Sequence, residues 1–343
     1  MLELEHPNKT LYLTVRDRLC RQIFEGVYPD GTPIPSERTL AEEFGVSRVT
    51  VRKALDLLEQ EHIVSRVQGS GTRVSLYLGP RPGDLEIITV VAPAQNQFFA
   101  RVIDAVQTCA DARDSLLLFQ QKPDGIPLEK CLFRIYQKGL RNLILWKEDL
   151  SIAPEALLRL KGLGMRIVLF DEASADSALD TVCLDNAGAV KMLADRLAPD
   201  PASCTFVTWD NPEIGSLRAR EKKFLSLFPD GKVIRIPYRY HNLEQSIPEE
   251  ILKQVIRELK NASCVLYAVG ELGIVCESAA RRAGIFHKAG MIGMMQGARE
   301  LEIQMVEQDF SAMAEQICLC LEEQNRIDSG WRPRHYSIPG VFL

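Results

Sequence analysis

The chain lacks the features of a membrane protein, a secreted protein or a common enzyme. No run approaches the ~20 apolar residues that a helix needs to cross a bilayer. The first residues, MLELEHPNKT, contain no basic stretch followed by an apolar one, so we expect no signal peptide. The signatures G-x-S-x-G, Walker A, H-E-x-x-H and G-x-G-x-x-G do not occur, and the five histidines are isolated from one another. We therefore expect a cytoplasmic protein that is not an enzyme, has no membrane contact and holds neither a cofactor nor a metal ion.

The cysteines do not form a pattern that indicates disulfides or a metal centre. There are nine, an odd number, and several lie in apolar runs, such as Cys204, Cys264 and Cys276. Cys318 and Cys320 form a C-x-C pair with no cluster of further ligands nearby. We expect free, buried thiols in a reducing compartment and no metal site.

The chain also lacks an excess of basic charge. Its formal net charge is −5, and residues 1–78 contain ten Lys and Arg against eleven Asp and Glu. This balance argues against a protein that coats nucleic acid without sequence preference. The basic residues of the segment are concentrated between Arg38 and Arg73, so a local basic surface is still possible.

Two short helices joined by a tight turn are predicted between residues 36 and 58. Ser36 precedes the first helix and Glu37 lies in its first turn, which is a good N-terminal signal. Gly45 suits a turn in the left-handed region, and Ser47 is placed to cap the second helix. Apolar residues follow at helical spacing on one face of each helix: Leu40, Ala41 and Phe44, then Val51, Ala54, Leu55 and Leu58.

The second helix and the basic hairpin after it have the features of a DNA reader. Arg48 and Arg52 lie one turn apart at the start of the helix, where a recognition helix contacts base edges, and arginine is the commonest bidentate reader of guanine. Arg66, Gly69-Ser70-Gly71 and Arg73 form a turn at which the backbone can approach phosphate or the minor groove closely. The alternative is that both helical arginines are merely solvated. The turn, the caps, the apolar face and the hairpin together favour a winged helix-turn-helix.

Residues 11–74 resemble the GntR family of bacterial transcription regulators. The family pattern I-x-x-G, PSER, VSRxTVRxAL and GxGTxV is matched by residues 23–26, 35–38, 46–55 and 69–74. The resemblance implies DNA contacts from Arg38, Ser47, Arg48, Thr50, Arg52 and Gly69, to which the predicted wing turn adds Ser70, Gly71 and Arg73. His62 stands where the family often has glycine, and this departure affects the turn into the wing.

Beyond a short Pro/Gly linker at residues 79–84, strand-like and helix-like runs alternate. The predicted strands are Ile87–Val91, Leu116–Phe119, Leu143–Trp146, Ile167–Phe170, Phe206–Thr208, Val233–Ile236, Cys264–Tyr267 and Met291–Gly293. The predicted helices between them include Phe99–Ala112, Ala187–Leu197, Ile214–Leu227 and Ile251–Leu259. This alternation indicates an α/β fold with parallel sheets and helices on both faces. About 260 residues are too many for one ordinary open sheet, so we expect two lobes with a ligand site between them, at the carboxyl ends of strands.

The second part of the chain, from about residue 86 onward, is similar to the effector domain of the LacI/GalR regulators. At the position of the family's NPFF motif this chain has Asn96-Gln97-Phe98-Phe99, and at the position of its V-D-N motif it has Leu184-Asp185-Asn186. Ser216 and Arg220 match an effector-contacting S-x-x-x-R, and Glu307-Gln308-Asp309 matches R-Q-D. The resemblance implies a type I periplasmic-binding-protein fold. A GntR head on such a sensor is the arrangement of sugar-utilisation repressors of the arabinose-repressor type.

Several positions that hold sugar hydroxyls in that family are changed here. The N-D pair falls at Val269-Gly270, the G-F-D at Gly293-Met294-Met295, and the Asp of the first strand–helix loop is replaced within Pro93-Ala94-Gln95. Because unpaired buried polar groups are costly, a sugar is one candidate effector and not an established one. The candidate effector contacts are Phe98, Phe99, Asp171, Trp209, Ser216, Arg220, Gln296 and Gln308. The alternatives are that the two phenylalanines belong to the core and that Arg220 is a surface residue.

These patterns predict a ligand-responsive DNA-binding transcription regulator, specifically a repressor of carbohydrate uptake or utilisation genes. We expect a winged helix-turn-helix at 1–78, a linker at 79–84 and a two-lobed effector-binding and dimerisation domain at 85–343. The protein would bind palindromic double-stranded operator DNA as a homodimer, and the chain would cross between lobes near 185–186, 308–309 and 329–333. The alternative is a stand-alone solute-binding or enzyme module whose winged helix serves protein contacts.

Overall fold

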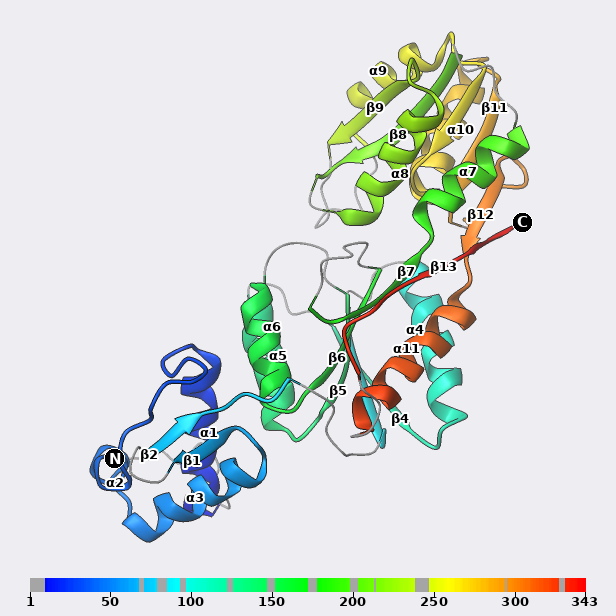
Figure 1. The fold of residues 1–343 in the computed structure, drawn as a ribbon. Helices are drawn as coiled ribbons and strands as arrows, with labels where there is room; N and C mark the ends of the chain where they lie inside the picture. The colour runs from blue at the N-terminus through cyan, green and yellow to red at the C-terminus, as the bar shows by residue number, and fades with distance from the viewer. Residues whose placement is uncertain are drawn as a thin grey trace.

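The computed structural model describes residues 10–67, 71–78, 85–92, 97–121, 126–146, 152–171, 178–197, 203–212, 214–237, 247–293, 295–326 and 331–343. These residues form a small N-terminal head and two lobes, each lobe built on a six-stranded sheet. Head, first lobe and second lobe follow one another across the molecule (Figure 1). No helix within the described ranges is long and apolar enough to cross a membrane. All nine cysteines are free and buried, as predicted.

The head is a winged helix-turn-helix. Its elements are α1 (Leu11–Phe24), α2 (Glu37–Phe44), α3 (Arg48–Gln60) and the antiparallel strands β1 (Val64–Val67) and β2 (Gly71–Val74). The side chain of Ser36 accepts a hydrogen bond from the Thr39 amide at 3.2 Å, and that of Ser47 accepts one from the Thr50 amide at 3.1 Å. Gly45 ends α2 at a φ of 65°, in the left-handed region that glycine adopts without strain. The predicted caps and turn are thereby confirmed.

His62 makes the turn from α3 into β1 with a φ of 53°. A side chain is strained in this left-handed conformation, whereas glycine is not. The family's preference for glycine at this position therefore has a direct conformational reason, and this chain departs from it at a cost in stability.

The first lobe has a fully parallel sheet in the order β13-β7-β6-β5-β3-β4. Alternate residues of its central strands point to opposite faces: Leu143 and Leu145 pack toward α5 and α6, and Ile144 packs toward α4 and α11. Its elements are β3 (Ile87–Ala92), α4 (Gln97–Asp111), β4 (Leu116–Gln121), α5 (Leu128–Gln137), β5 (Asn142–Trp146), α6 (Pro154–Gly162), β6 (Arg166–Phe170), β7 (Asp180–Leu184), α11 (Phe310–Asn325) and β13 (His335–Ile338).

The second lobe repeats this plan with the order β14-β12-β11-β10-β8-β9, in which only β14 is antiparallel to its neighbour. Helices α7 and α8 cover one face, and α9 and α10 cover the other. Its elements are α7 (Asn186–Leu197), β8 (Cys204–Asp210), α8 (Gly215–Leu227), β9 (Lys232–Pro237), α9 (Glu249–Leu259), β10 (Cys264–Tyr267), α10 (Gly270–Arg282), β11 (Lys288–Ile292), β12 (Gln304–Gln308) and β14 (Gly340–Phe342).

Followed through the described helices and strands, the chain passes between the lobes three times. Two crossings lie where they were predicted, at Asp185 between β7 and α7 and at Asp309 between β12 and α11. The third prediction, residues 329–333, of which 329 and 330 lie outside the described residues, is wrong. Helix α11 and strand β13 both belong to the first lobe, so the chain changes lobe only at Pro339, between β13 and β14.

The head packs directly on the first lobe, with α1 lying beside α5 and α6 (Figure 1). The rings of Phe24 and Phe133 stack with centroids 4.8 Å apart and an interplanar angle of 11°. The Arg159 Nε donates a hydrogen bond to the carbonyl oxygen of Phe24 at 2.6 Å. Apolar side chains of α1, α2 and α3 form one continuous buried core with those of α5 and α6.

A cluster of buried polar side chains around Tyr136 lies in the same interface. Arg16 Nη2 donates to the Tyr136 hydroxyl at 3.1 Å, and that hydroxyl donates to Cys20 Sγ at 3.4 Å. The Arg141 guanidinium lies over the Tyr136 ring at 4.2 Å from its centroid. Burial raises the pKa of Tyr136 well above its usual value, so the phenol keeps the proton that it donates.

The predicted linker at 79–84 lies outside the described residues.

Candidate functional site

Helix α3 presents one buried and one exposed face. Val51, Ala54, Leu55 and Leu58 are buried in the head. The opposite side of the first two turns carries Arg48, Val49 and Arg52, and Val49 is 62% exposed. A helix that shows two arginines and an apolar side chain at its N-terminal end has the groups that read guanine edges and thymine methyls.

The predicted DNA-contacting arginines of the two helices differ in how they are held. Arg52 donates from Nε and Nη2 to the Glu37 carboxylate, with the shortest distance, Nη2–Oε2, at 2.8 Å. Arg38 forms one exposed ion pair with Glu42 along its own helix, Nε–Oε1 3.0 Å. Arg48 forms no ion pair with any residue in the part of the chain that the structure describes.

Ser47 and Thr50 hold the start of the recognition helix together. Besides the cap on the Thr50 amide, the two side-chain hydroxyls are 2.8 Å apart and share a hydrogen bond. Both side chains therefore have a structural role in the free protein, and their contact with DNA is still a prediction.

The wing consists of β1 and β2 and is tied to the rest of the head. Gly71 has a φ of 81°, where a side chain would be strained. Arg73 Nη1 donates to the Gly31 carbonyl at 3.1 Å. Arg66 is ion-paired with Asp56 of α3, and its amide donates to Glu59 Oε1 at 3.2 Å. Of the predicted wing contacts, Gly69 and Ser70 lie outside the described residues.

The second group of candidate residues lies where the two lobes meet, at the carboxyl ends of their strands; we call this region the lobe junction. Arg220 is only 3% exposed and comes from α8. Its Nε donates to Asn186 Oδ1 at 2.7 Å, and its Nη1 donates to the Ala268 carbonyl at 2.6 Å. Arg220 thus joins the first residue of α7, beside one lobe crossing, to the end of β10, and the alternative of a surface residue is wrong.

The predicted effector residue Asp171 acts on Arg220 across the junction. It follows β6 directly and has a φ of 56°. Burial lowers the pKa of Arg220, and the charge of Asp171 opposes that shift by favouring the cation. The two side chains therefore interact although they come from different lobes.

Aromatic side chains line the first-lobe side of the junction. Phe98 is half-buried and lies against Phe170 and Phe310, with ring centroids 5.7 and 5.5 Å away. Phe99 is 3% exposed and meets Trp146 edge-on at 4.8 Å. Phe99 is therefore part of the core, as the alternative for it proposed.

A charged pair also links the lobes. Arg101 of α4 is ion-paired with Glu307 of β12, and the Arg101 guanidinium lies 4.9 Å from the centroid of the Phe310 ring. Gln308 is the next residue after Glu307 and is buried at the end of β12. Ser216 is buried as well, one helical turn before Arg220.

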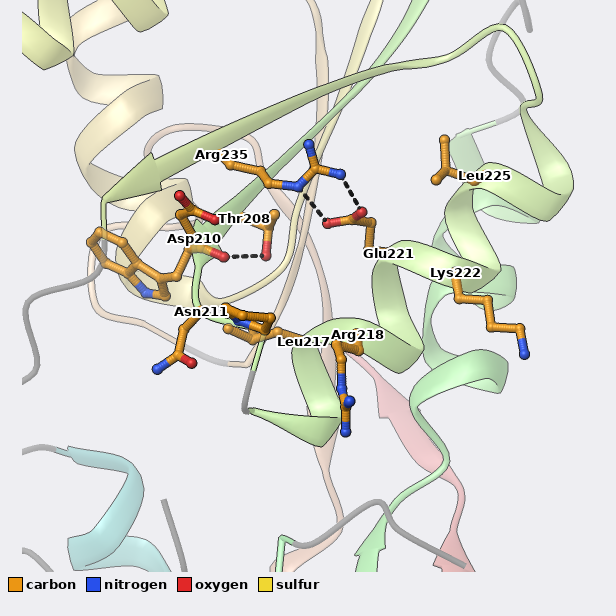
Figure 2. Close-up of a pocket in the computed structure, with 11 residues that line it drawn as sticks. Thr208, Asp210, Asn211, Leu217, Arg218, Glu221, Lys222, Leu225 and Arg235 are labelled. Carbon is orange, nitrogen blue, oxygen red and sulfur yellow. Dashed lines mark hydrogen bonds and ion pairs between the residues drawn. The ribbon is translucent and has the colours of Figure 1, made fainter. Parts of the chain in front are cut away.

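The other two predicted effector residues lie apart from this group. Gln296 is exposed in the turn after β11, and no hydrogen bond joins it to the junction residues in the described ranges. Trp209 lines a separate cavity of about 430 Å³ on the second lobe (Figure 2). The lining residues are Thr208, Trp209, Asp210, Asn211, Pro212, Leu217, Arg218, Glu221, Lys222, Leu225 and Arg235. Figure 2 shows Arg235 paired with Glu221, whereas Arg218 and Lys222 extend away from the sheet.

Several residues of these sites were not among the DNA or effector contacts predicted from the sequence. They are Glu37 beside Arg52 in the head, and Arg101, Trp146, Phe170, Asn186, Glu307 and Phe310 at the lobe junction. One signal could have found some of them: Trp146, Phe170 and Glu307 each end or nearly end a strand, where ligands bind in this class of fold.

Comparison with known proteins gives two separate results for the two parts of the chain. The family described as "Bacterial regulatory proteins, gntR family" matches residues 11–74. The mannosyl-D-glycerate transport/metabolism system repressor MngR of Escherichia coli K12 is 48% identical over 67 residues, which are 20% of this chain and 28% of that protein. The chain therefore spans just over a quarter of the length of this curated relative.

The remainder of the chain is similar in structure to regulators of another kind. A LacI transcriptional regulator from Lactobacillus brevis superposes with a TM-score of 0.63 at 14% identity, over 75% of this chain and all of the other. The Cra transcriptional dual regulator from Pseudomonas putida, solved in complex with fructose 1-phosphate, gives a TM-score of 0.60 at 18% identity, over 76% and 98% of the two chains. Residues 11–74 are thus a gntR-family helix-turn-helix domain, joined to a domain with the two-lobed fold of LacI-type regulators.

Proposed function

We propose that this protein is a ligand-responsive transcription repressor that binds operator DNA through its head. The observation that carries the proposal is the exposed N-terminal end of α3, with Arg48 and Arg52 on a doubly capped helix pair beside a wing. A helix held in this way fits the major groove, where arginine discriminates guanine.

The test is selection of duplexes from a random-sequence pool, followed by binding measurements on the selected and on scrambled DNA. We expect selected DNA to bind at least a thousandfold more tightly at fixed salt, as specific regulators do. Equal binding to both would overturn the proposal and would favour a head that serves protein contacts.

We further propose that the effector is a small polyhydroxylated molecule bound at the lobe junction. Asp171, Gln308 and Arg220 offer hydrogen-bonding groups beside the half-buried Phe98, a combination that suits a sugar with a polar edge and an apolar face. The names of the relatives point the same way, because MngR is a repressor of a sugar-derivative system and the Cra structure holds a sugar phosphate.

Sugars, sugar phosphates and sugar acids can be screened by thermal shift, because a ligand that binds only the folded state raises the unfolding temperature. We expect a hit that also changes operator affinity. A hit that stabilises the protein but leaves operator affinity unchanged would separate ligand binding from regulation and would contradict the proposed switch.

Regulation through a palindromic operator requires two heads, so we propose a homodimer formed by the lobes. Edge strand β4 offers an apolar surface, with Leu116 and Leu118 being 70% and 41% exposed. Sedimentation should give a dimer at micromolar concentration, and Leu118→Asp should shift it toward monomer. A wild-type protein that sediments as a monomer both free and on operator DNA would exclude this assembly.

The docking of the head on α5 and α6 suggests how the effector acts. Strands β5 and β6 pack on these helices through Leu143, Leu145 and Leu169, and the same strands end at the junction with Trp146 and Phe170. A ligand at the junction would therefore favour one position of α5 and α6, the helices on which the head packs. It can do so only to the extent that its affinity differs between the two arrangements of the lobes.

A further inference from the structure

The ion pair between Glu37 and Arg52 has a geometry that matters for base recognition. Arg52 uses its side edge, Nε and Nη2, to donate to both carboxylate oxygens of Glu37 at 3.2, 3.2 and 2.8 Å. A guanidinium has five N–H donors in a fixed plane. Engagement of the side edge leaves the end edge, Nη1 and the second Nη2 hydrogen, directed away from Glu37.

The pair is only partly exposed and joins the two helices of the motif. The Glu37 side chain is 25% exposed and that of Arg52 is 55% exposed. Glu37 is the first residue of α2, and Arg52 lies in the second turn of α3. The hydrogen bond from Arg52, followed by nearby positive charge, lowers the pKa of Glu37, so its carboxylate is charged at neutral pH.

The other carboxylates on the recognition helix are engaged elsewhere. Asp56, one turn beyond Arg52, is ion-paired with Arg66 of the wing, and Glu59 accepts from the Arg66 amide. Glu37 is thus the acid that fixes the plane of the Arg52 guanidinium in the described part of the head.

We propose that Glu37 is a positioning residue for DNA sequence recognition: it orients Arg52 so that the end edge of the guanidinium donates two hydrogen bonds to O6 and N7 of one guanine in the major groove. This inference rests on the proposed function, since it specifies how the head reads DNA. Arg48, which forms no ion pair in the described residues, is not held in this way, so the two arginines read different bases with different dependence on Glu37.

The experiment uses the full-length protein and the duplex selected from the random pool. Each guanine in turn is replaced by 7-deazaguanine, which pairs normally with cytosine but lacks the N7 acceptor. For the wild-type protein we expect a loss of affinity of roughly 5- to 150-fold at the guanine read by Arg52. Arg52→Ala removes every donor of the guanidinium, and it should remove the penalty at that one position.

Glu37→Gln is the informative variant, and Glu43→Gln is its matched control. Glu43 is exposed on the same helix and has no ion pair in the described residues, so both variants remove one negative charge from the head. Both should therefore gain general DNA affinity to a similar extent. Only Glu37→Gln should reduce the 7-deazaguanine penalty at the Arg52 position, to less than threefold, while penalties at other guanines persist. Glu37→Asp, which keeps the charge on a shorter side chain, should recover part of the penalty.

A Glu37→Gln protein with an unchanged penalty at every guanine would overturn the inference and leave a purely structural ion pair. The inference is also overturned if Arg52→Ala keeps the full penalty at every guanine. Glu37→Asp decides the positioning role should Glu37→Gln fail to fold, and a Glu37→Asp protein with the full wild-type penalty would then contradict it. If the wild-type protein selects no sequence at all, the proposed function itself fails, which is a distinct and separately visible result.

Discussion

A single methyl group placed at Gly162 should separate the head from the first lobe. Gly162 is the last residue of α6, and a Cβ built on it would lie 2.7 Å from Cβ of Leu76, in the segment that follows the wing. Two carbon atoms cannot approach so closely, and a Cβ atom has no rotamer by which to move away. Gly162→Ala therefore forces the segment around Leu76 off the lobe.

The magnitude can be worked from this contact. Overpacking by one methyl group typically costs about 1–3 kcal/mol. Alanine is favoured over glycine in a helix by roughly 1 kcal/mol, so α6 itself should not be weakened. The cost falls on the interface, where 1–3 kcal/mol changes the ratio of docked to undocked heads by about 5- to 150-fold.

The assay follows from the shared core. Because α1 and α5 belong to one buried cluster, the wild-type head and first lobe should unfold together in calorimetry. In Gly162→Ala we expect the head to unfold in its own transition at lower temperature, with faster amide exchange in α5. Operator affinity should survive, since α3 and the wing lie away from α5 and α6 (Figure 1), but its response to effector should shrink.

A compensating change makes the test specific. Leu76→Gly removes the atoms that meet the new methyl group, so the double variant should recover part of the docking that Gly162→Ala alone loses. The reasoning is refuted if Gly162→Ala unfolds in one transition like the wild type and keeps its effector response.

Three other outcomes are expected. Arg48→Ala should weaken binding to the selected operator by roughly 1–3 kcal/mol and leave binding to random DNA unchanged, whereas Arg73→Ala should weaken binding to both about equally. Fluorescence anisotropy on both DNAs measures this, and equal losses for Arg48→Ala would contradict its role. His62→Gly should raise the free energy of unfolding by about 1 kcal/mol in urea titrations, because it relieves a φ of 53°, and a decrease would show that contacts of the imidazole outweigh the strain. Burial raises the pKa of Cys20 to about 11 from an ordinary 9.0. The contribution of the buried thiol to the free energy of unfolding is therefore complete below pH 9 and is lost as the pH rises toward 11, by roughly 2–3 kcal/mol. Wild-type stability should therefore fall more steeply over this range than that of Cys20→Ala, and parallel curves would refute this assignment.

The head could be predicted almost completely from the sequence because its signals are local. Ser36, Gly45 and Ser47 each determine a helix end through a contact within three or four residues, and the structure confirms all three. The eight predicted strands also exist, because each contains a short apolar run of strand length. Strands β7, β12, β13 and β14 were not among them. The last two are half-exposed and contain polar residues or glycine, which hides them from a search for apolar runs.

The docking of the head could not be predicted because it depends on partners distant in sequence. The apolar face of α5 shows that Phe133 and Tyr136 are buried somewhere, but the sequence does not say that Phe24 and Cys20 cover them. The same holds for the aromatic group of Phe98, Phe170 and Phe310, which three elements bring together. The sequence predicts a short linker between the head and the lobes and gives no sign of the core that they share in the structure.

Arg220 shows how such packing changes the design of an experiment. From the sequence, Arg220→Ala should abolish the effector response and leave ligand-free operator affinity intact. In the structure, this variant removes a buried cation from Asn186 and the Ala268 carbonyl and leaves Asp171 without it. Loss of a buried charged partner typically costs 3–5 kcal/mol, so we expect a lower unfolding temperature and altered lobe crossings even without effector.

Asp171→Asn is the sharper test of the junction. Asparagine keeps the shape of the side chain and tolerates the φ of 56°, so the backbone stays unstrained, and the stability that is lost is that of the charge beside the buried Arg220 cation. It removes the charge that acts on Arg220 across the lobes and one acceptor for a ligand hydroxyl. We expect operator affinity without effector to stay within twofold of the wild type, while the effector concentration needed for half response rises at least tenfold. An unchanged dose–response curve, measured with the compound found in the thermal-shift screen, would remove Asp171 from the effector site.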